Sequence, residues 1–192
     1  RDINSVADVK NEIQLSLPGM YLIGYNGGQI YDCGQQKTLY KAALTLSQTA
    51  YIIEASEKAG VHVHTYSDTH IVTPRDDEEL VYYRRVIKTP VIFSPNVTDA
   101  LTDGPCKCIA IELKDAQKLE NFRLSLLDWA KEEGVSMIYS NPYYLEFFPS
   151  CAGKGAAVGK LCEILGINPY FSVAAGDAQN DLSMIEAAGM GI

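Results

Sequence analysis

Residues 173–189 read VAAGDAQNDLSMIEAAG and place two acids and an amide where an apolar run gives way to a helical pattern. The run YFSVAA is small and continuously apolar, which is typical of a parallel strand covered on both faces. Gly176 lets the chain turn sharply, and Asp177 then projects its carboxylate beyond the strand. Asn180 and Asp181 follow at the start of the next helix. Because ligands of open α/β sheets bind beyond the carboxyl ends of strands, this junction is the first candidate site.

The groups at this junction favour a metal ion that bridges to a phosphate. Mg²⁺ takes one or two protein carboxylates, several waters and substrate oxygens, and a helix N-terminus offers free backbone N–H groups to an anion. The alternative is that Asn180 or Asp181 only caps the helix and that Asp177 ends a strand in solvent. Spacing alone does not separate the two interpretations.

Lys154, within CAGKGAAVG, is the second candidate. It stands between Gly153 and Gly155 at the head of a predicted helix, the end at which the helix dipole disfavours a cation. A lysine is explained there if an anion sits with it, and the glycines would let the backbone approach closely. For Lys154 considered alone, a solvated loop lysine is the favoured alternative.

Two further patterns carry less weight. GAAVGK, residues 155–160, is one residue short of a P-loop, and Leu161 replaces the Ser or Thr that would hold Mg²⁺, so we reject it. His62, His64 and His70 lie on a predicted hairpin, with His62 and His64 on one face. They could hold a metal, but a packed or solvated face is the favoured interpretation.

Helix–strand units at both ends of the chain bracket a middle that is rich in hairpins. Apolar periodicity predicts helices over residues 1–17, 45–60, 75–88, 114–134, 154–167 and 180–189, and strands or hairpins over 21–32, 61–73, 135–149 and 170–176. The simplest architecture is an α/β fold. A parallel-sheet core over residues 1–42 and 148–192 is interrupted by an inserted α+β domain over residues 43–147.

Composition limits the function classes. The net charge of -8 argues against nucleic acid or an anionic membrane as the main partner. A small anionic substrate would need a local cluster of cations or a bound metal. No apolar run reaches the ~18 residues that span a membrane, and no basic-then-apolar leader is present. Five irregularly spaced cysteines are expected to be reduced, packed hydrophobes of a cytoplasmic protein.

Both ends of the chain read as internal. The chain begins at Arg1 rather than Met, directly on a helical pattern. It stops at GMGI, residues 189–192, which reads as the opening of another buried strand. We therefore expect these residues to be a segment of a longer protein.

Five short motifs occur in order along the chain. They are Arg1, YNGG (25–28), YYLEFFP (143–149), AGKG (152–155) and GDAQND (176–181). GDAQND resembles the fourth motif, GDxxND, of the haloacid dehalogenase-like (HAD) hydrolases, and AGKG resembles their Lys-Gly third motif. YNGG is similar to the turn after the second core strand in the Cof-type phosphatase branch (subfamily IIB), and YYLEFFP to the strand leading back from its cap. Arg1 resembles the arginine that closes a Thr-Gly-Arg second motif.

This resemblance implies a HAD-like Rossmannoid parallel-sheet core with an inserted cap that closes over the site, excludes water and selects the substrate. It implies a Mg²⁺-dependent phosphatase that acts on small phosphorylated metabolites such as sugar phosphates, through an aspartyl-phosphate. Asp177 would then hold Mg²⁺, and Asp181 would support the metal site. Lys154 would neutralise the phosphate and orient the nucleophile. The remaining phosphate-binding residues would be Asn180, Asn26 and Arg1.

One part of the family pattern is missing from residues 1–192. The first motif, DxDGT, supplies the nucleophile and the general acid, and only Asp76-Asp77 comes near a D-x-D pair. The segment alone is therefore expected to be inactive, even if its parent is active. Two alternatives stay open: a non-catalytic module that binds metal and phosphate, and a phosphomutase, which would share every motif seen. The physiological substrate and the oligomeric state cannot be read from the sequence.

Overall fold

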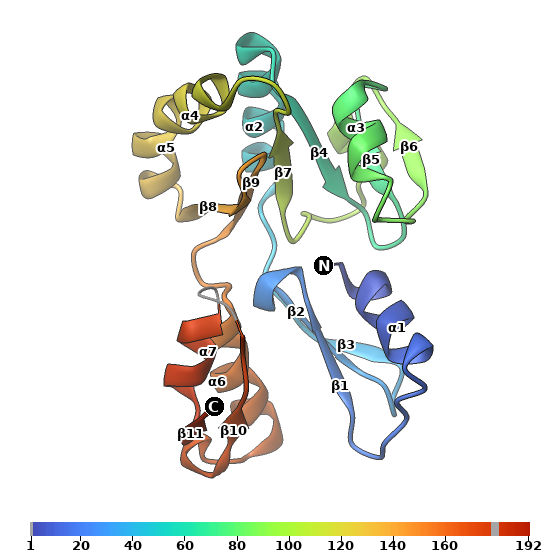
Figure 1. Cartoon of the computed structure of the whole chain (residues 1–192), viewed down its shortest axis with the longest axis vertical. Coiled ribbons are helices and arrows are strands. Elements are labelled where there is room, and N and C mark those ends of the chain that lie inside the picture. Colours follow the sequence, from blue (N-terminus) through green and yellow to red (C-terminus); the bar gives the residue numbers. More distant parts are fainter. Residues whose placement is uncertain (1, 178–180) are drawn as a thin grey trace. The chain divides into compact units, whose positions relative to one another are not determined.

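The computed structural model describes residues 2–177 and 181–192, and the chain divides into two compact units. The first unit combines residues 1–42 with residues 151–192, and the second is the continuous stretch 43–150 (Figure 1). The second unit is thus an insertion between the two segments of the first.

The first unit contains two small sheets. β1 (Tyr21–Gly24), β2 (Gln29–Asp32) and β3 (Lys37–Lys41) form an antiparallel sheet in that order. β10 (Val173–Ala174) and β11 (Met190–Gly191) form a parallel pair, so a parallel strand is present before GDAQND as predicted. The strand is shorter than the predicted stretch 170–176, because Pro169–Phe171 form a 3-10 helix, and Val173 is exposed instead of covered. The helical elements of this unit are α1 (Ile3–Glu12), η1 (Tyr25–Gly27), α6 (Lys154–Leu165), η3 (Pro169–Phe171) and α7 (Leu182–Ala187).

Helix α1 is shorter than the sequence predicts. It begins at a side-chain cap, where the Asp2 carboxylate accepts a 3.0 Å hydrogen bond from the backbone N–H of Ser5. The predicted helix over residues 1–17 is wrong in its last turn, because α1 ends at Glu12 and Gln14 has a left-handed φ of 54°. Ile13 and Leu17 are consequently exposed instead of buried.

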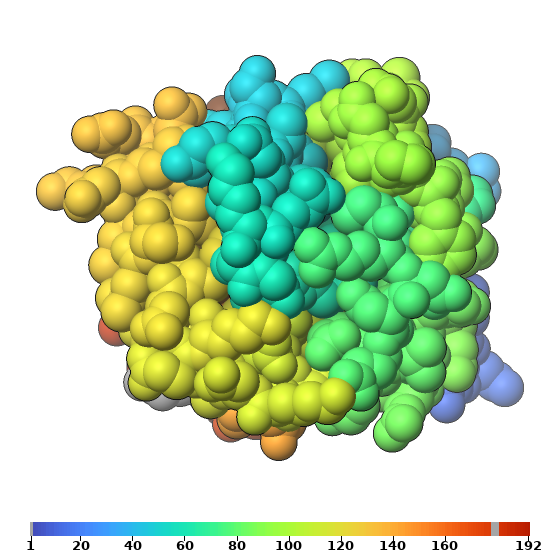
Figure 2. All heavy atoms as spheres, turned by 90° about the horizontal axis from the view of Figure 1, so that it is seen from above, coloured from blue at the N-terminus to red at the C-terminus, as the bar shows by residue number. Residues whose placement is uncertain are grey.

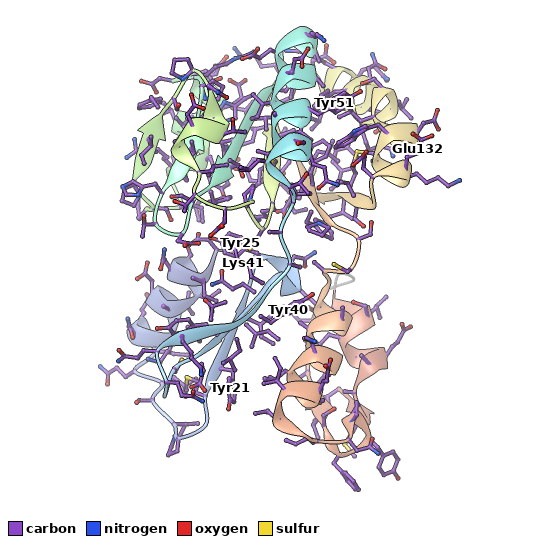
Figure 3. All side chains as sticks on the ribbon, turned by 180° about the vertical axis from the view of Figure 1, so that it is seen from behind. Tyr21, Tyr25, Tyr40, Lys41, Tyr51 and Glu132 are labelled. Atoms are coloured by element: carbon purple, nitrogen blue, oxygen red, sulfur yellow. The ribbon has the colours of Figure 1, made fainter. Side chains whose placement is uncertain are left out.

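The YNGG stretch joins β1 to β2 as the sequence predicts. Gly24 pairs with Gln29 across the turn. Asn26 and Gly27 have φ values of 57° and 91°, a left-handed conformation that Asn and Gly adopt at low cost. Tyr40 on β3 meets α6, since the Nζ atom of Lys160 lies 5.5 Å from the centre of its ring (Figure 3).

The second unit is built on one six-stranded sheet with the order β6-β5-β4-β7-β9-β8. All neighbouring strands are antiparallel except β5 and β6, which are parallel. The strands are β4 (His62–Tyr66), β5 (Ile71–Thr73), β6 (Val91–Phe93), β7 (Cys108–Ile111), β8 (Val135–Asn141) and β9 (Tyr144–Pro149). The helical elements are α2 (Leu46–Ala59), α3 (Glu78–Tyr83), η2 (Val97–Ala100), α4 (Ala116–Ser125) and α5 (Leu127–Glu132).

The core of the second unit lies between one face of this sheet and helices α2, α4 and α5. Val63, Cys108 and Phe147 point from the sheet into this core, where Leu119 and Phe122 of α4 meet them. Figure 2 shows α2 from the outside, alongside α4. Because side chains alternate along a strand, every second residue of β4 lies on the opposite face.

The helices on this face are held by caps at their ends and by contacts with one another. Thr45 and Gln48 form a capping box at the start of α2, and Gly60 ends the helix with φ 67°. Tyr51 of α2 stacks on Trp129 of α5, with ring centres 4.6 Å apart (Figure 3).

Three boundaries in this unit differ from the sequence-based expectation. The helix predicted over residues 75–88 is only α3, which ends at Tyr83 and is followed by turns. The single helix predicted over residues 114–134 is two helices, because Leu126 leaves helical geometry with ψ near -1°. β9 runs on to Pro149, which pairs with Val135, so the expected domain limit after residue 147 falls inside a strand. Within the described part of the chain, none of the helices has both the length and the apolar character needed to cross a bilayer.

Candidate active site

Lys154 is the first residue of α6 and forms an ion pair with Asp181, the residue that precedes α7. The ammonium Nζ donates to Oδ1 of the carboxylate. The Asp181 side chain is buried and that of Lys154 is half-buried. The structure therefore joins two of the predicted site residues, which are 27 positions apart in the sequence.

Asn26 belongs to a turn that packs against the start of α6. A Cβ added to Gly27 would lie 2.1 Å from the carbonyl oxygen of Gly153, so only a glycine permits this approach. Asn26 itself is half-buried. The backbone of the YNGG turn thus meets the AGKG loop, and a third predicted residue lies in the neighbourhood of Lys154.

Asp177 follows β10 after Ala175 and Gly176 and is exposed. Within the described residues its carboxylate has no hydrogen bond or ion pair. The backbone after β10 lies close to the residue that precedes α7, because a Cβ added to Gly176 would lie 2.4 Å from the Cβ of Asp181. Asn180 and Arg1, the other predicted phosphate contacts, lie outside the described residues.

The donor set fits a hard divalent cation. Mg²⁺ needs only one or two protein carboxylates, and the exposed Asp177 carboxylate at a strand end is of that kind. Asp181 is oriented by Lys154, as expected of a carboxylate that supports a site. In residues 2–177 and 181–192, no three His, Cys, Asp or Glu side chains come together to hold a metal through protein ligands alone.

The histidines of β4 form a buried hydrogen-bonded chain. His62 Nδ1 lies 2.8 Å from the Asp77 carboxylate, and His62 Nε2 lies 3.0 Å from His64 Nδ1. The rings of Tyr66 and Tyr83 pack against His64. The packed interpretation of His62 and His64 is what the structure shows.

Sequence reasoning missed a buried ion pair on the face of the sheet that carries His62 and His64. Lys107 Nζ lies 2.9 Å from Glu146 Oε2, and both side chains are almost fully buried. Burial alone would raise the pKa of Glu146, but the charge and hydrogen bond of Lys107 hold that pKa below its usual range. The signal was a single charged residue in each of two apolar strands, CKCIAI and YYLEFF.

The five cysteines are free. Cys106, Cys108 and Cys162 are buried as expected, but Cys33 is half-buried and Cys151 is exposed, so the expectation that all are packed is wrong for these two. Burial raises the pKa of the Cys108 thiol to about 12. A thiol of that pKa stays protonated near neutral pH and is a poor nucleophile. Cys108 is therefore a packing residue of the second unit.

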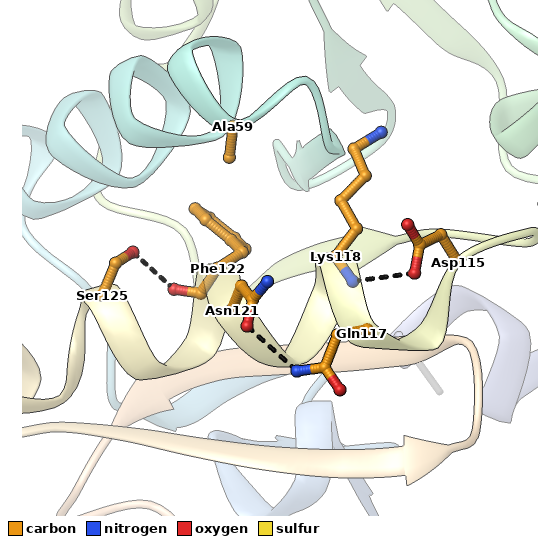
Figure 4. A pocket seen from close by; sticks show the side chains of 7 residues that line it. All are labelled: Ala59, Asp115, Gln117, Lys118, Asn121, Phe122 and Ser125. Atoms are coloured by element: carbon orange, nitrogen blue, oxygen red, sulfur yellow. Dashed lines mark hydrogen bonds between the residues drawn. The ribbon is translucent and has the colours of Figure 1, made fainter.

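A depression of ≈ 450 Å³ lies between α2 and α4, and none of the predicted site residues lines it (Figure 4). Two of its polar groups form hydrogen bonds within α4 or at its start: Asp115 accepts from the N–H of Lys118 at 3.1 Å, and Gln117 donates to Asn121 at 3.0 Å. We assign no function to it. The depression is lined by Ala59, Asp115, Gln117, Lys118, Asn121, Phe122 and Ser125.

Comparison with known proteins identifies the class. Residues 1–192 match the family model described as haloacid dehalogenase-like hydrolase. A haloacid dehalogenase-like hydrolase from Bacteroides thetaiotaomicron has a TM-score of 0.89 and 26% identity, covering 100% of this chain and 71% of that one. The Thermotoga maritima protein TM0651 has a TM-score of 0.81 and 26% identity, covering 98% and 68%.

Proteins that are similar in sequence support the same class. The Bacillus subtilis protein YxeH is 28% identical over 196 residues, which is 100% of this chain and 71% of YxeH. The 5-amino-6-(5-phospho-D-ribitylamino)uracil phosphatase YwtE of Bacillus subtilis is 28% identical over 193 residues, covering 88% of this chain and 65% of YwtE. The chain belongs to the haloacid dehalogenase-like hydrolases. Within them it is a phosphohydrolase of the Cof-type branch.

Proposed function

We propose that this chain provides the phosphate-binding and metal-binding part of a Mg²⁺-dependent phosphatase for small phosphorylated metabolites, such as sugar phosphates. The reaction would pass through an aspartyl-phosphate whose nucleophile lies outside residues 1–192, since these contain no D-x-D pair. The observation that carries the proposal is the ion pair between Lys154, at the start of α6, and Asp181. Asp181 belongs to the same GDAQND motif as Asp177, which lies beyond the end of β10.

Each residue has a role that follows from its chemistry. The Lys154 ammonium neutralises the phosphoryl oxygens and orients the nucleophile, while Asp181 holds that ammonium in place. Asp177 offers the oxygen ligand for Mg²⁺, which when bound supplies positive charge to the phosphoryl group. Asn180, Asn26 and Arg1 are the proposed further phosphate contacts.

The second unit is proposed to act as the cap. It is inserted in the sequence between the YNGG turn and the AGKG loop, so it can move as a body while both loops stay in the first unit. A cap of this kind excludes water and selects the substrate. The free cysteines are consistent with the cytoplasm as the compartment.

The proposal is tested with the full-length protein and p-nitrophenyl phosphate as substrate. Lys154→Met and Asp177→Asn should each lower kcat/KM by at least about a hundredfold, because each removes charge that stabilises the transition state. Asp177→Asn should also raise the Mg²⁺ concentration needed for half-maximal activity. Lys160→Met is the matched control, since Lys160 lies on the same helix and pairs with the exposed Glu163.

Two results would contradict the proposal. Activity of Lys154→Met or Asp177→Asn equal to that of the wild type would exclude these residues from the site. Conversion of a sugar monophosphate to its isomer, without release of inorganic phosphate, would identify a phosphomutase instead.

A further inference from the structure

Helix α6 begins without a side chain of its own to cap it. Its N-cap residue is Gly153, which offers no side-chain oxygen. The first N–H groups of a helix lack partners within that helix and need acceptors from elsewhere. The N–H of Gly155 finds one in Ser183, whose Oγ accepts it at 3.3 Å. The cap of α6 is thus supplied by a residue of α7.

The two helix starts are in direct contact at this point. A Cβ added to Gly155 would lie 2.3 Å from the carbonyl oxygen of Ser183, so the buried Gly155 leaves no space between them. Next to this contact, Lys154 forms its ion pair with Asp181. Consecutive residues of α6 are therefore bonded to two residues at the start of α7.

We infer that Ser183 is a positioning residue for Lys154. The inference rests on the proposed function, because it assigns Lys154 a role in phosphoryl transfer. A lysine side chain has four rotatable bonds, and its ion pair alone fixes only its far end. The Ser183 hydroxyl fixes the near end, since it holds the peptide N–H that directly follows Lys154. With both ends held, the ammonium stays where the charge develops in the transition state.

The first measurement separates kcat from KM. Ser183→Ala removes the acceptor and Ser183→Thr keeps it. In the full-length protein with p-nitrophenyl phosphate, Ser183→Ala should lower kcat about tenfold, the size of one lost helix cap, with KM changed less than about twofold. Ser183→Thr should restore kcat. Ser172→Ala is the matched control: its hydroxyl donates to the Pro169 carbonyl at 2.6 Å in the same unit, and not to a residue of α6.

The second measurement does not depend on activity. Gly155 is the only glycine in residues 1–192 that follows a lysine. Labelling with ¹⁵N-glycine and ¹³C-carbonyl lysine therefore separates its amide signal from those of the other glycines in residues 1–192. Hydrogen exchange of that amide should be about tenfold faster in Ser183→Ala than in the wild type or Ser183→Thr, because the exchange rate follows the loss of a bond of this size.

The results distinguish the two proposals. Unchanged exchange at Gly155 in Ser183→Ala, or unchanged kcat while Lys154→Met is inactive, overturns the positioning role and leaves the proposed function standing. A wild-type protein that hydrolyses no phosphate ester, or an active Lys154→Met, overturns the proposed function and with it the positioning role, whatever the exchange at Gly155. A loss of kcat in Ser183→Thr equal to that in Ser183→Ala also overturns the role.

Discussion

His62 and His64 share a hydrogen bond of 3.0 Å between Nε2 of the first ring and Nδ1 of the second. Asp77 continues the chain on one side, and on the other side the fully buried Nε2 of His64 has no partner among the described residues. Tyr66, Tyr83 and Lys107 are the other titratable groups around His64. Burial of His64 next to His62 and Lys107 disfavours a positive charge on the His64 ring.

The first prediction concerns pH. Burial, together with the charges of His62 and Lys107, holds the pKa of His64 well below its usual value. The unfolded chain binds this proton as the pH falls below about 6.5 and the folded chain does not, so acid favours unfolding. The free energy of unfolding should fall by up to roughly 2 kcal/mol between pH 7 and pH 5. Urea titrations at several pH values measure it.

A matched pair of variants isolates this effect. His64→Gln should flatten the dependence between pH 7 and pH 5, even if its stability is lower throughout. His70→Gln should keep it, because His70 is only half-buried and its ring bonds to the neighbouring Thr69. An equal slope in wild type and His64→Gln would show that His64 is not the group responsible.

The buried pair of Lys107 and Glu146 gives the second prediction. Lys107→Met leaves a buried carboxylate without its cation and should cost about 3–5 kcal/mol of unfolding free energy. The double variant Lys107→Met, Glu146→Leu should recover most of this loss, since no unpaired charge remains. Denaturant unfolding compares the three proteins. A double variant no more stable than Lys107→Met would count against this account.

The third prediction concerns the contact between Gly27 and Gly153. Gly27→Ala introduces a Cβ 2.1 Å from a carbonyl oxygen in addition to the strain of φ 91°. Gly19→Ala is the control for strain alone, because Gly19 has φ 71° and nothing within 4 Å of the added Cβ. We expect about 1–2 kcal/mol of destabilisation for Gly19→Ala and roughly 1–3 kcal/mol more for Gly27→Ala. Equal thermal unfolding midpoints would disprove the close approach.

The fourth prediction concerns the core of the second unit. Phe122 is 2% exposed, and its ring centre lies 5.9 Å from that of Phe147. Phe122→Ala should destabilise the unit by about 3–5 kcal/mol through lost burial and the cavity left behind. Phe93→Ala, at a side chain that is 51% exposed, should cost under about 1 kcal/mol. Comparable losses of unfolding free energy in the two variants would show that Phe122 is not part of the core.

Local signals in the sequence predicted much of the fold. The Asn26-Gly27 turn was readable because few residues other than Asn and Gly adopt left-handed backbone. The continuous apolar run before Gly176 predicted the parallel strand but not its short length, since Pro169–Phe171 form a 3-10 helix. Apolar periodicity overstated three helices, since it contains no term for the left-handed Gln14, for the turns after Tyr83 or for the break at Leu126.

The candidate site was predicted in part. GDAQND and AGKG indicated Lys154 and Asp181, but their ion pair is a tertiary contact that no local pattern encodes. Ser183 was overlooked because a serine in the first turn of a helix is ordinary, and its partner lies in another helix. Lys107 and Glu146 were overlooked because their pairing depends on the register between β7 and β9.

The insertion of one unit inside the other sets an order of events during synthesis. Residues 1–42 leave the ribosome first, but the chain that completes their unit begins only at Cys151. At roughly 5–20 residues per second, translation of the intervening stretch takes about 5–20 seconds. The inserted unit can therefore fold before α6 has been synthesised. The nascent YNGG turn lacks its contact with Gly153 until the AGKG loop emerges.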